Sequence, residues 1–130
     1  MTAQTQANWT DEDETAILNA IDKWVEGEVR PIAREHDQAD SYPHELVEQM
    51  KELGLFGAII SPNYGGLGLP ASTYAKIVLK VAAAWMAPSG IFNSHLIMAS
   101  AIERTGTEEQ KAEWLSKMAT GELRGGIALT

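Results

Sequence analysis

Apolar residues recur at intervals of three and four along most of the chain, which is the spacing of one helix face. The first such run comprises Ile17, Ile21, Trp24, Val25 and Val29. Thr10 and four acidic residues precede it. This pattern is typical of a helix N-terminus, because a hydroxyl caps free N–H groups and acids complement the helix dipole. Pro31 is expected to kink or restart this helix, with a continuation to about Asp40.

The same periodicity predicts a second and a third helix. The second opens at Ser41-Tyr42-Pro43 and ends at Gly54, because proline suits a first helical turn and glycine suits a C-terminus. Its predicted buried face contains Leu46, Val47, Met50 and Leu53. The third helix covers Ser72 to Met86, and its predicted apolar face contains Tyr74, Ile77, Val78, Val81 and Trp85.

Two more helices are predicted near the C-terminus. One extends from Ile91 to Arg104 and is expected to follow a turn at Pro88-Ser89-Gly90. The other begins at Thr107, which forms a capping box with Gln110, and ends near Gly121. The chain is therefore predicted to be all-α and to fold as a helical bundle.

The segment from Leu53 to Pro70 is apolar but has no helical periodicity. It holds five of the eleven glycines and two of the five prolines, so the backbone must turn several times. A P-loop is excluded because no Lys follows the glycines. Gly66-Leu67-Gly68 also lacks the third glycine of a dinucleotide fingerprint. We interpret the segment as a turn-rich connector that packs between helical layers.

The last four residues, Ile127 to Thr130, have the composition of a strand. A strand of this length has no partner in an otherwise helical chain. We therefore expect that it docks on something else, or that the chain is the front part of a larger protein.

Composition narrows the range of partners. The formal net charge is −8 and the pI is about 4.8, which argues against nucleic acid or an anionic membrane as the main partner. The chain has no cysteine, so it has no disulfide, thiolate metal site or thiol nucleophile. The segment Met1 to Trp9 is polar and unlike a secretory signal. We expect a cytoplasmic protein.

One stretch, Val81 to Ile102, contains no Asp, Glu, Lys or Arg and is long enough to cross a bilayer. Pro88-Ser89-Gly90 interrupts it, and polar residues follow. Two buried helical segments joined by a turn are the favoured interpretation.

The three histidines are not spaced as metal ligands. His36 and His44 lie among charged residues and are expected to be exposed. His95 lies in the uncharged stretch and is expected to be a hydrogen-bonded core residue, with a pocket-lining role as the alternative. No catalytic or metal-binding set can be argued from the spacing.

Several short motifs occur in an order that resembles the N-terminal helical domain of acyl-CoA dehydrogenases. The resemblance covers roughly Trp9 to Thr130. The matching motifs are Glu52-Leu53-Gly54-Leu55-Phe56-Gly57, Ser61-Pro62-Asn63-Tyr64-Gly65-Gly66-Leu67-Gly68, Gly106-Thr107-Glu108-Glu109-Gln110-Lys111, Trp114-Leu115 with Gly121-Glu122, and Ala128-Leu129-Thr130. The resemblance implies a helical domain over residues 1–126. Residues 127–130 then begin a middle β domain, the rest of which is absent.

The resemblance also implies an activity. Family members dehydrogenate an acyl-CoA thioester between its α and β carbons, as in fatty acid β-oxidation. They use flavin adenine dinucleotide (FAD), pass electrons to an electron-transfer flavoprotein, and assemble as homotetramers or related heterotetramers. Their catalytic glutamate belongs to a C-terminal domain that this chain lacks, so the chain alone is expected to be inactive.

Two sets of residues match family sites. Ile127, Leu129 and Thr130 match the strand along the flavin. Asn93, Ser94 and Ile97 match the helix that lines the acyl pocket.

Trp85 departs from the family pattern and could reshape the pocket entrance. Three alternatives remain open: an acyl-CoA oxidase, a flavin monooxygenase of the same fold, or a stand-alone helical interaction domain.

Overall fold

The first helix begins at the residue that the sequence predicts. In the computed structural model, which describes residues 7–130, α1 (Asp11–Trp24) is capped by Thr10. Asp13 N donates to Thr10 Oγ1 (3.1 Å), and Thr10 N donates to the Asp13 carboxylate (3.0 Å). The two bonds satisfy free N–H groups at both positions. Residues 1–6 of the predicted helical domain, with most of the polar segment Met1 to Trp9, lie outside the described residues.

The helix restarts near Pro31, as predicted. A π-helical turn, η1 (Val25–Val29), leads without a loop into α2 (Arg30–Ala39). Pro31 lies in the first turn of α2, where its missing N–H is tolerated. Asp40 then ends α2 in the left-handed region, with φ of 50°.

Helix α3 (His44–Glu52), which is the second predicted helix, follows Pro43 at its N-cap position. Its predicted face is buried except for Leu53, which is half-buried beyond the helix end; the buried side chains are Leu46, Val47 and Met50. Gly54 follows with φ of 72°, so the predicted glycine C-terminus is confirmed.

The predicted turn at Pro88-Ser89-Gly90 is wrong. The chain breaks at Trp85, which is extended (φ −162°, ψ 124°) between α4 (Ala71–Ala84) and α5 (Met86–Thr105). Pro88 lies in the first turn of α5, where a helix has no use for its N–H. A proline that reads as a break can thus mark a start. Among residues 7–130, no helix has the length and hydropathy needed to cross a membrane.

The last helix, α6 (Glu108–Thr120), has the predicted capping box. Gln110 N donates to Thr107 Oγ1 (3.2 Å), and Thr107 N donates to the Gln110 side chain (2.9 Å). Gly121 ends the helix with φ of 77°. Both ends were therefore correctly predicted.

The connector packs against the core, as expected. It contains two 3₁₀ turns, η2 (Leu55–Gly57) and η3 (Pro62–Tyr64), and η2 contacts α3, α5 and α6. Its backbone folds back on itself: Leu67 N donates to Gly57 O (2.8 Å), and Leu69 N donates to Ala58 O (2.8 Å). These bonds satisfy polar groups that are shielded from water.

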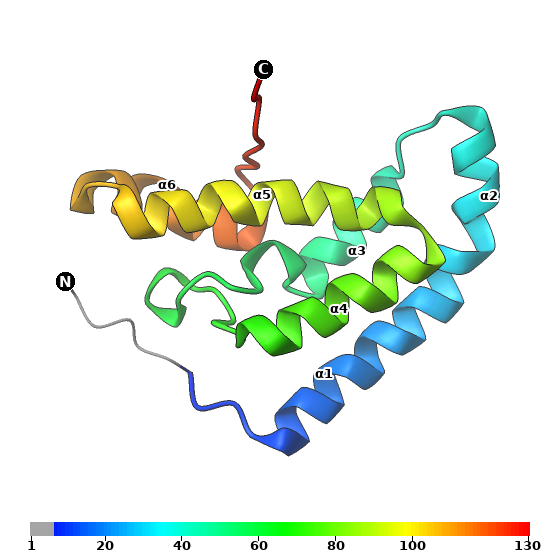
Figure 1. The fold of residues 1–130 in the computed structure, drawn as a ribbon, viewed down its shortest axis with the longest axis horizontal. Helices are drawn as coiled ribbons and strands as arrows, with labels where there is room; N and C mark the ends of the chain where they lie inside the picture. The colour runs from blue at the N-terminus through cyan, green and yellow to red at the C-terminus, as the bar shows by residue number, and fades with distance from the viewer. Residues whose placement is uncertain (1–6) are drawn as a thin grey trace.

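Four helices pack side by side in the order α1, α4, α5 and α6 (Figure 1). Polar side chains join α1 to α4: Lys80 contacts Asp22 (2.7 Å), and Thr73 donates to Glu14. The C-terminal end of the chain projects away from the helices (Figure 1).

We predict that Gly66→Ala destabilises the fold by roughly 3 kcal/mol or more, because its Cβ would overlap the carbonyl group of Ile60. Gly90→Ala is the matched control. No atom lies within 4 Å of that Cβ, and alanine in a helix gains about 0.5–1 kcal/mol over glycine. Urea unfolding measures both free energies, and equal effects would contradict the assignment of Gly66 to a close backbone contact.

Candidate functional site

Between residues 90 and 101 the outward face of α5 carries no charge. We define this outer face by Gly90, Ser94, Ile97 and Ala101, which follow one another at intervals of four, three and four. Ile97 is 47% exposed. From residue 90 to residue 101 the helix contains no Asp, Glu, Lys or Arg. A helix face turned to water normally carries charged residues, so this face is suited to contact with apolar atoms.

Beside the outer face, Asn93 is held by a residue of α4. The Tyr74 hydroxyl donates to Asn93 Oδ1 (2.7 Å). Burial raises the pKa of Tyr74 to about 12, so the phenol stays neutral and remains a donor. This bond fixes the Asn93 side chain, which is half-buried, and leaves its amide N–H groups available to a ligand.

The chain returns to this part of α5 after α6. We call residues 122–130, which follow Gly121, the exit segment. Gly125 N donates to His95 Nδ1 (3.2 Å), and a Cβ on Gly125 would lie 3.0 Å from Met98 Cγ. The exit segment therefore meets α5 at His95 and Met98, which directly follow Ser94 and Ile97 in the sequence.

The strand predicted at Ile127 to Thr130 is not formed. These residues have no regular secondary structure, and within residues 7–130 their backbone groups take part in no hydrogen bond. Ile127 is 43% exposed and Leu129 is 89% exposed. A strand needs a neighbouring strand to satisfy its backbone, and the helical domain offers none. The predicted cofactor contacts at Ile127, Leu129 and Thr130 stay predictions, as do the substrate contacts at Asn93, Ser94 and Ile97.

His95 is a hydrogen-bonded core residue, as predicted, and at 1% exposure it lines no open surface. Its Nε2 lies 3.0 Å from Phe56 O and 3.0 Å from Met118 O. The Phe56 ring meets it edge to face at 5.1 Å. Burial lowers the pKa of His95, and the charge of Arg124 acts in the same direction. The ring is therefore held neutral.

Of the other two histidines, His44 is exposed as predicted, whereas His36 is half-buried. His36 stacks on Trp85, with ring centroids 5.7 Å apart. Trp85 Nε1 also points at Asp37 (3.4 Å). Trp85 is therefore turned toward α2.

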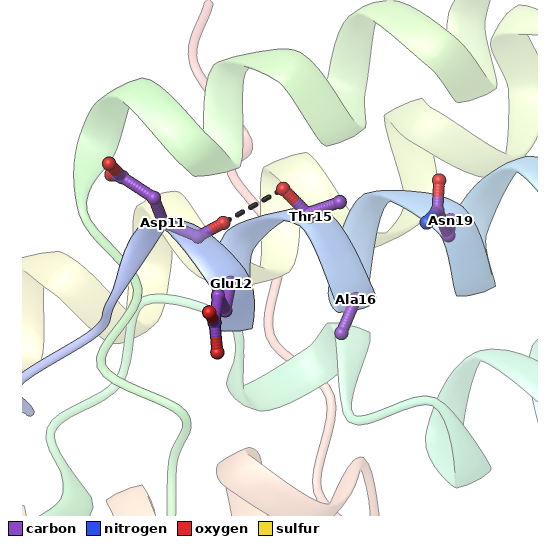
Figure 2. Close-up of a pocket in the computed structure, with 5 residues that line it drawn as sticks. All are labelled: Asp11, Glu12, Thr15, Ala16 and Asn19. Atoms are coloured by element: carbon purple, nitrogen blue, oxygen red, sulfur yellow. Dashed lines mark hydrogen bonds between the residues drawn. The ribbon is translucent and has the colours of Figure 1, made fainter.

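A depression of about 380 Å³ on α1 lacks the uncharged lining that marks the outer face of α5 (Figure 2). It is lined by Asp11, Glu12, Thr15, Ala16 and Asn19. All five come from one helix, and the hydrogen bond among them joins Thr15 Oγ1 to Asp11 O within that helix (2.8 Å). The acids there complement the helix dipole. Within residues 7–130, no three His, Asp or Glu side chains are grouped as a metal site requires.

Comparisons with known proteins agree with this fold. The family model for the acyl-CoA dehydrogenase N-terminal domain matches residues 11–122. A short-chain-specific acyl-CoA dehydrogenase of Clostridium acetobutylicum is 35% identical over 124 residues, which cover 95% of this chain and 32% of that protein. An acryloyl-CoA reductase (NADH) of Anaerotignum propionicum is 34% identical over 110 residues, which cover 83% of this chain and 27% of that protein.

Solved structures are similar over the same region. Butyryl-CoA dehydrogenase from Megasphaera elsdenii matches with a TM-score of 0.78 at 25% identity, covering 92% of this chain and 32% of that one. Glutaryl-CoA dehydrogenase from Mycobacterium smegmatis, in complex with FADH2, matches with a TM-score of 0.79 at 26% identity. That match covers 88% of this chain and 30% of the other.

The arrangement of α1 to α6 is thus that of the N-terminal helical domain of acyl-CoA dehydrogenases. The chain belongs to the acyl-CoA dehydrogenase family. It spans about a third of the length of the relatives that it matches.

We predict that His95 makes the folded chain less stable in mild acid. Its ordinary pKa is 6.5 and its folded pKa is lower, so between these values the unfolded chain binds a proton that the folded chain does not. The contribution of the neutral His95 ring to the free energy of unfolding is fully present above about pH 6.5. It decreases as the pH drops toward the folded pKa, by up to about 1.4 kcal/mol per pH unit.

Urea unfolding from pH 5 to pH 8 measures this slope in the wild type and in His95→Gln. The difference between the two proteins isolates His95 from Glu103, whose pKa is raised by burial and which acts in the opposite direction. Identical pH profiles would contradict the prediction.

Proposed function

We propose that this chain is the helical domain of a flavin-dependent enzyme that dehydrogenates an acyl-CoA thioester between its α and β carbons. The observation that carries the proposal is the meeting of two segments. The exit segment, which contains the predicted flavin contacts, meets α5 at His95 and Met98, the sequence neighbours of the predicted acyl contacts Ser94 and Ile97. Family membership and relatives named for acyl-CoA substrates support it.

In this proposal the outer face of α5 forms one wall of the acyl pocket. Ile97 and Ser94 contact the acyl chain, and the uncharged face excludes water from the reacting carbons. Asn93, fixed by Tyr74, offers amide N–H groups at the edge of that wall. The wall binds and orients the substrate, which is the contribution of a protein whose cofactor does the redox chemistry.

The exit segment suits one edge of a flavin ring. Ile127 and Leu129 expose apolar side chains, Thr130 adds a hydroxyl, and the backbone groups there have no partner within residues 7–130. A flavin held at this segment would supply the acceptor for the hydride that leaves the substrate β carbon. Residues 125–130 carry no basic side chain, so we assign the phosphates and adenine of FAD to other residues of the proposed enzyme.

The catalytic base is also assigned outside this chain. No carboxylate lies on the outer face of α5, so removal of the α proton requires a group from elsewhere. We accordingly propose that the 130-residue chain alone is inactive. The whole enzyme would act in fatty acid β-oxidation in the cytoplasm as a tetramer, with an electron-transfer flavoprotein as its electron acceptor.

We predict that the natural gene product carries an oxidised-flavin absorption spectrum that bleaches when an acyl-CoA is added. The bleaching reports transfer of the substrate hydride to the flavin. A folded, full-length product without flavin would overturn the proposed function.

We predict that Ser94→Trp in that product shifts its preference toward shorter acyl chains, because an indole on the outer face shortens the pocket. The shift is measured as the ratio of kcat/KM for a long and a short acyl-CoA. Ser116→Trp is the matched control, since Ser116 is an exposed serine on another helix, α6. An unchanged ratio in Ser94→Trp would remove Ser94 from the pocket.

A further inference from the structure

His95 makes three hydrogen bonds in the core, and together they define its chemical state. Nε2 faces the carbonyl oxygens of Phe56 and Met118, and Nδ1 faces the backbone N–H of Gly125. A carbonyl oxygen only accepts, so Nε2 must carry a proton. A backbone N–H only donates, so Nδ1 must have a free lone pair. One form of the ring satisfies all three partners, and it is the neutral tautomer protonated at Nε2.

The other two forms of the ring each break the arrangement. The tautomer protonated at Nδ1 leaves two buried carbonyl groups facing a lone pair. The charged ring places an N–H against the N–H of Gly125, where the two donors repel. An unpaired polar group in a core is costly, so the native fold selects the tautomer.

The three bonds join parts of the chain that are distant in sequence. Phe56 belongs to η2 in the connector, Met118 lies in the last turn of α6, and Gly125 is a half-buried residue within the otherwise exposed exit segment. Met118 O also accepts the N–H of Gly121, which caps α6 (3.1 Å), so His95 Nε2 is its second donor. His95 therefore links three backbone segments through one side chain of α5.

The position of Gly125 depends on close packing as well. A Cβ on Gly125 would lie 3.0 Å from Met98 Cγ and 3.1 Å from Met118 Cε, so the backbone lies directly on both side chains. Before this point, Leu123 N donates to Lys117 O (3.1 Å), and the Arg124 guanidinium donates to the Tyr42 hydroxyl (2.9 Å). Beyond it, the backbone has no hydrogen bond within residues 7–130.

We propose that His95 is a positioning residue that fixes the place and direction in which the exit segment leaves the helical domain. It does so as an Nε2-protonated ring that holds the Gly125 N–H, while its other nitrogen is locked by Phe56 and Met118. The consequence for Ile127, Leu129 and Thr130 at a flavin rests on the proposed function. The attachment of Gly125 to His95 does not.

The test uses NMR of the 130-residue chain, without flavin or substrate. Long-range ¹⁵N–¹H spectra identify which ring nitrogen of His95 carries the proton, and hydrogen exchange measures protection of the Gly125 amide. His95→Gln is the main variant, because its terminal amide can still donate to Phe56 O and Met118 O but offers no acceptor at the Nδ1 position.

We predict an Nε2-protonated ring at pH 7.5 and a Gly125 amide that exchanges more slowly than that of Gly126. In His95→Gln the Gly125 amide should exchange about two- to tenfold faster, the effect of losing one hydrogen bond. Residues 126–130 should also gain mobility, whereas the amides of α1 should be unchanged.

Two glycine variants keep the test decisive should His95→Gln not fold. Gly125→Ala pushes the backbone away from Met98 and Met118, and Gly126→Ala meets no atom within 4 Å. Faster exchange at residue 125 in the first variant and not in the second supports the proposal.

A His95 ring protonated at Nδ1 would overturn it. So would an unprotected Gly125 amide in the wild type, or an unchanged Gly125 exchange rate in a folded His95→Gln. Because no flavin is involved, such a result would leave the spectrum of the gene product as an independent test of the proposed function.

Discussion

The structure depends on pairing the backbone polar groups of a buried loop. The connector is irregular, yet Leu55, Phe56, Ala58 and Ile60 are almost completely shielded from water. An irregular segment rarely lies in a core, because its N–H and C=O groups need partners that a helix would supply itself. Here the two halves of the loop form backbone hydrogen bonds with each other, and His95 of α5 donates to Phe56 O.

This constraint explains several residues at once. Gly66 lies so close to the carbonyl group of Ile60 that no side chain fits. A Cβ added to Gly57 would likewise lie only 2.7 Å from Ala119 O. The glycines thus permit close approach between backbone segments, which in turn brings hydrogen-bonding groups within reach of each other. The motifs that resemble the family in this region are therefore explained by packing, and no chemical role for them is needed.

The two sides of helix α5 differ in burial and in function. Its inner side contributes Phe92, Leu96 and Ala99 to the core. Its outer face is uncharged and partly exposed, and the exit segment lies beside it at His95 and Met98. A helix whose inner side is packed in the core can therefore carry an uncharged surface on its other side, because core packing supplies most helical stability.

Much of the fold could be predicted from local chemistry. A capping residue acts on backbone groups only a few positions away, so a helix end can be predicted from the local sequence. The helix ends predicted in this way are those at Thr10, Gly54, Thr107 and Gly121. The break at Trp85 was not legible. Proline and glycine at positions 88 and 90 suggested a turn, but both are compatible with the first turns of a helix, and only the packing of α4 against α5 selects the break.

The candidate site also has features that the local sequence predicts and contacts that it does not predict. The lack of charge at Ser94 and Ile97 and the burial of His95 are visible in the sequence, because they follow from residue type and helical period. The partners of His95 are not, since Phe56, Met118 and Gly125 lie 39, 23 and 30 residues away. By itself the sequence determined that the chain is helical, where the capped helix ends lie, and the family. The tertiary structure alone decided which backbone groups meet, because those contacts arise only when distant segments are packed together.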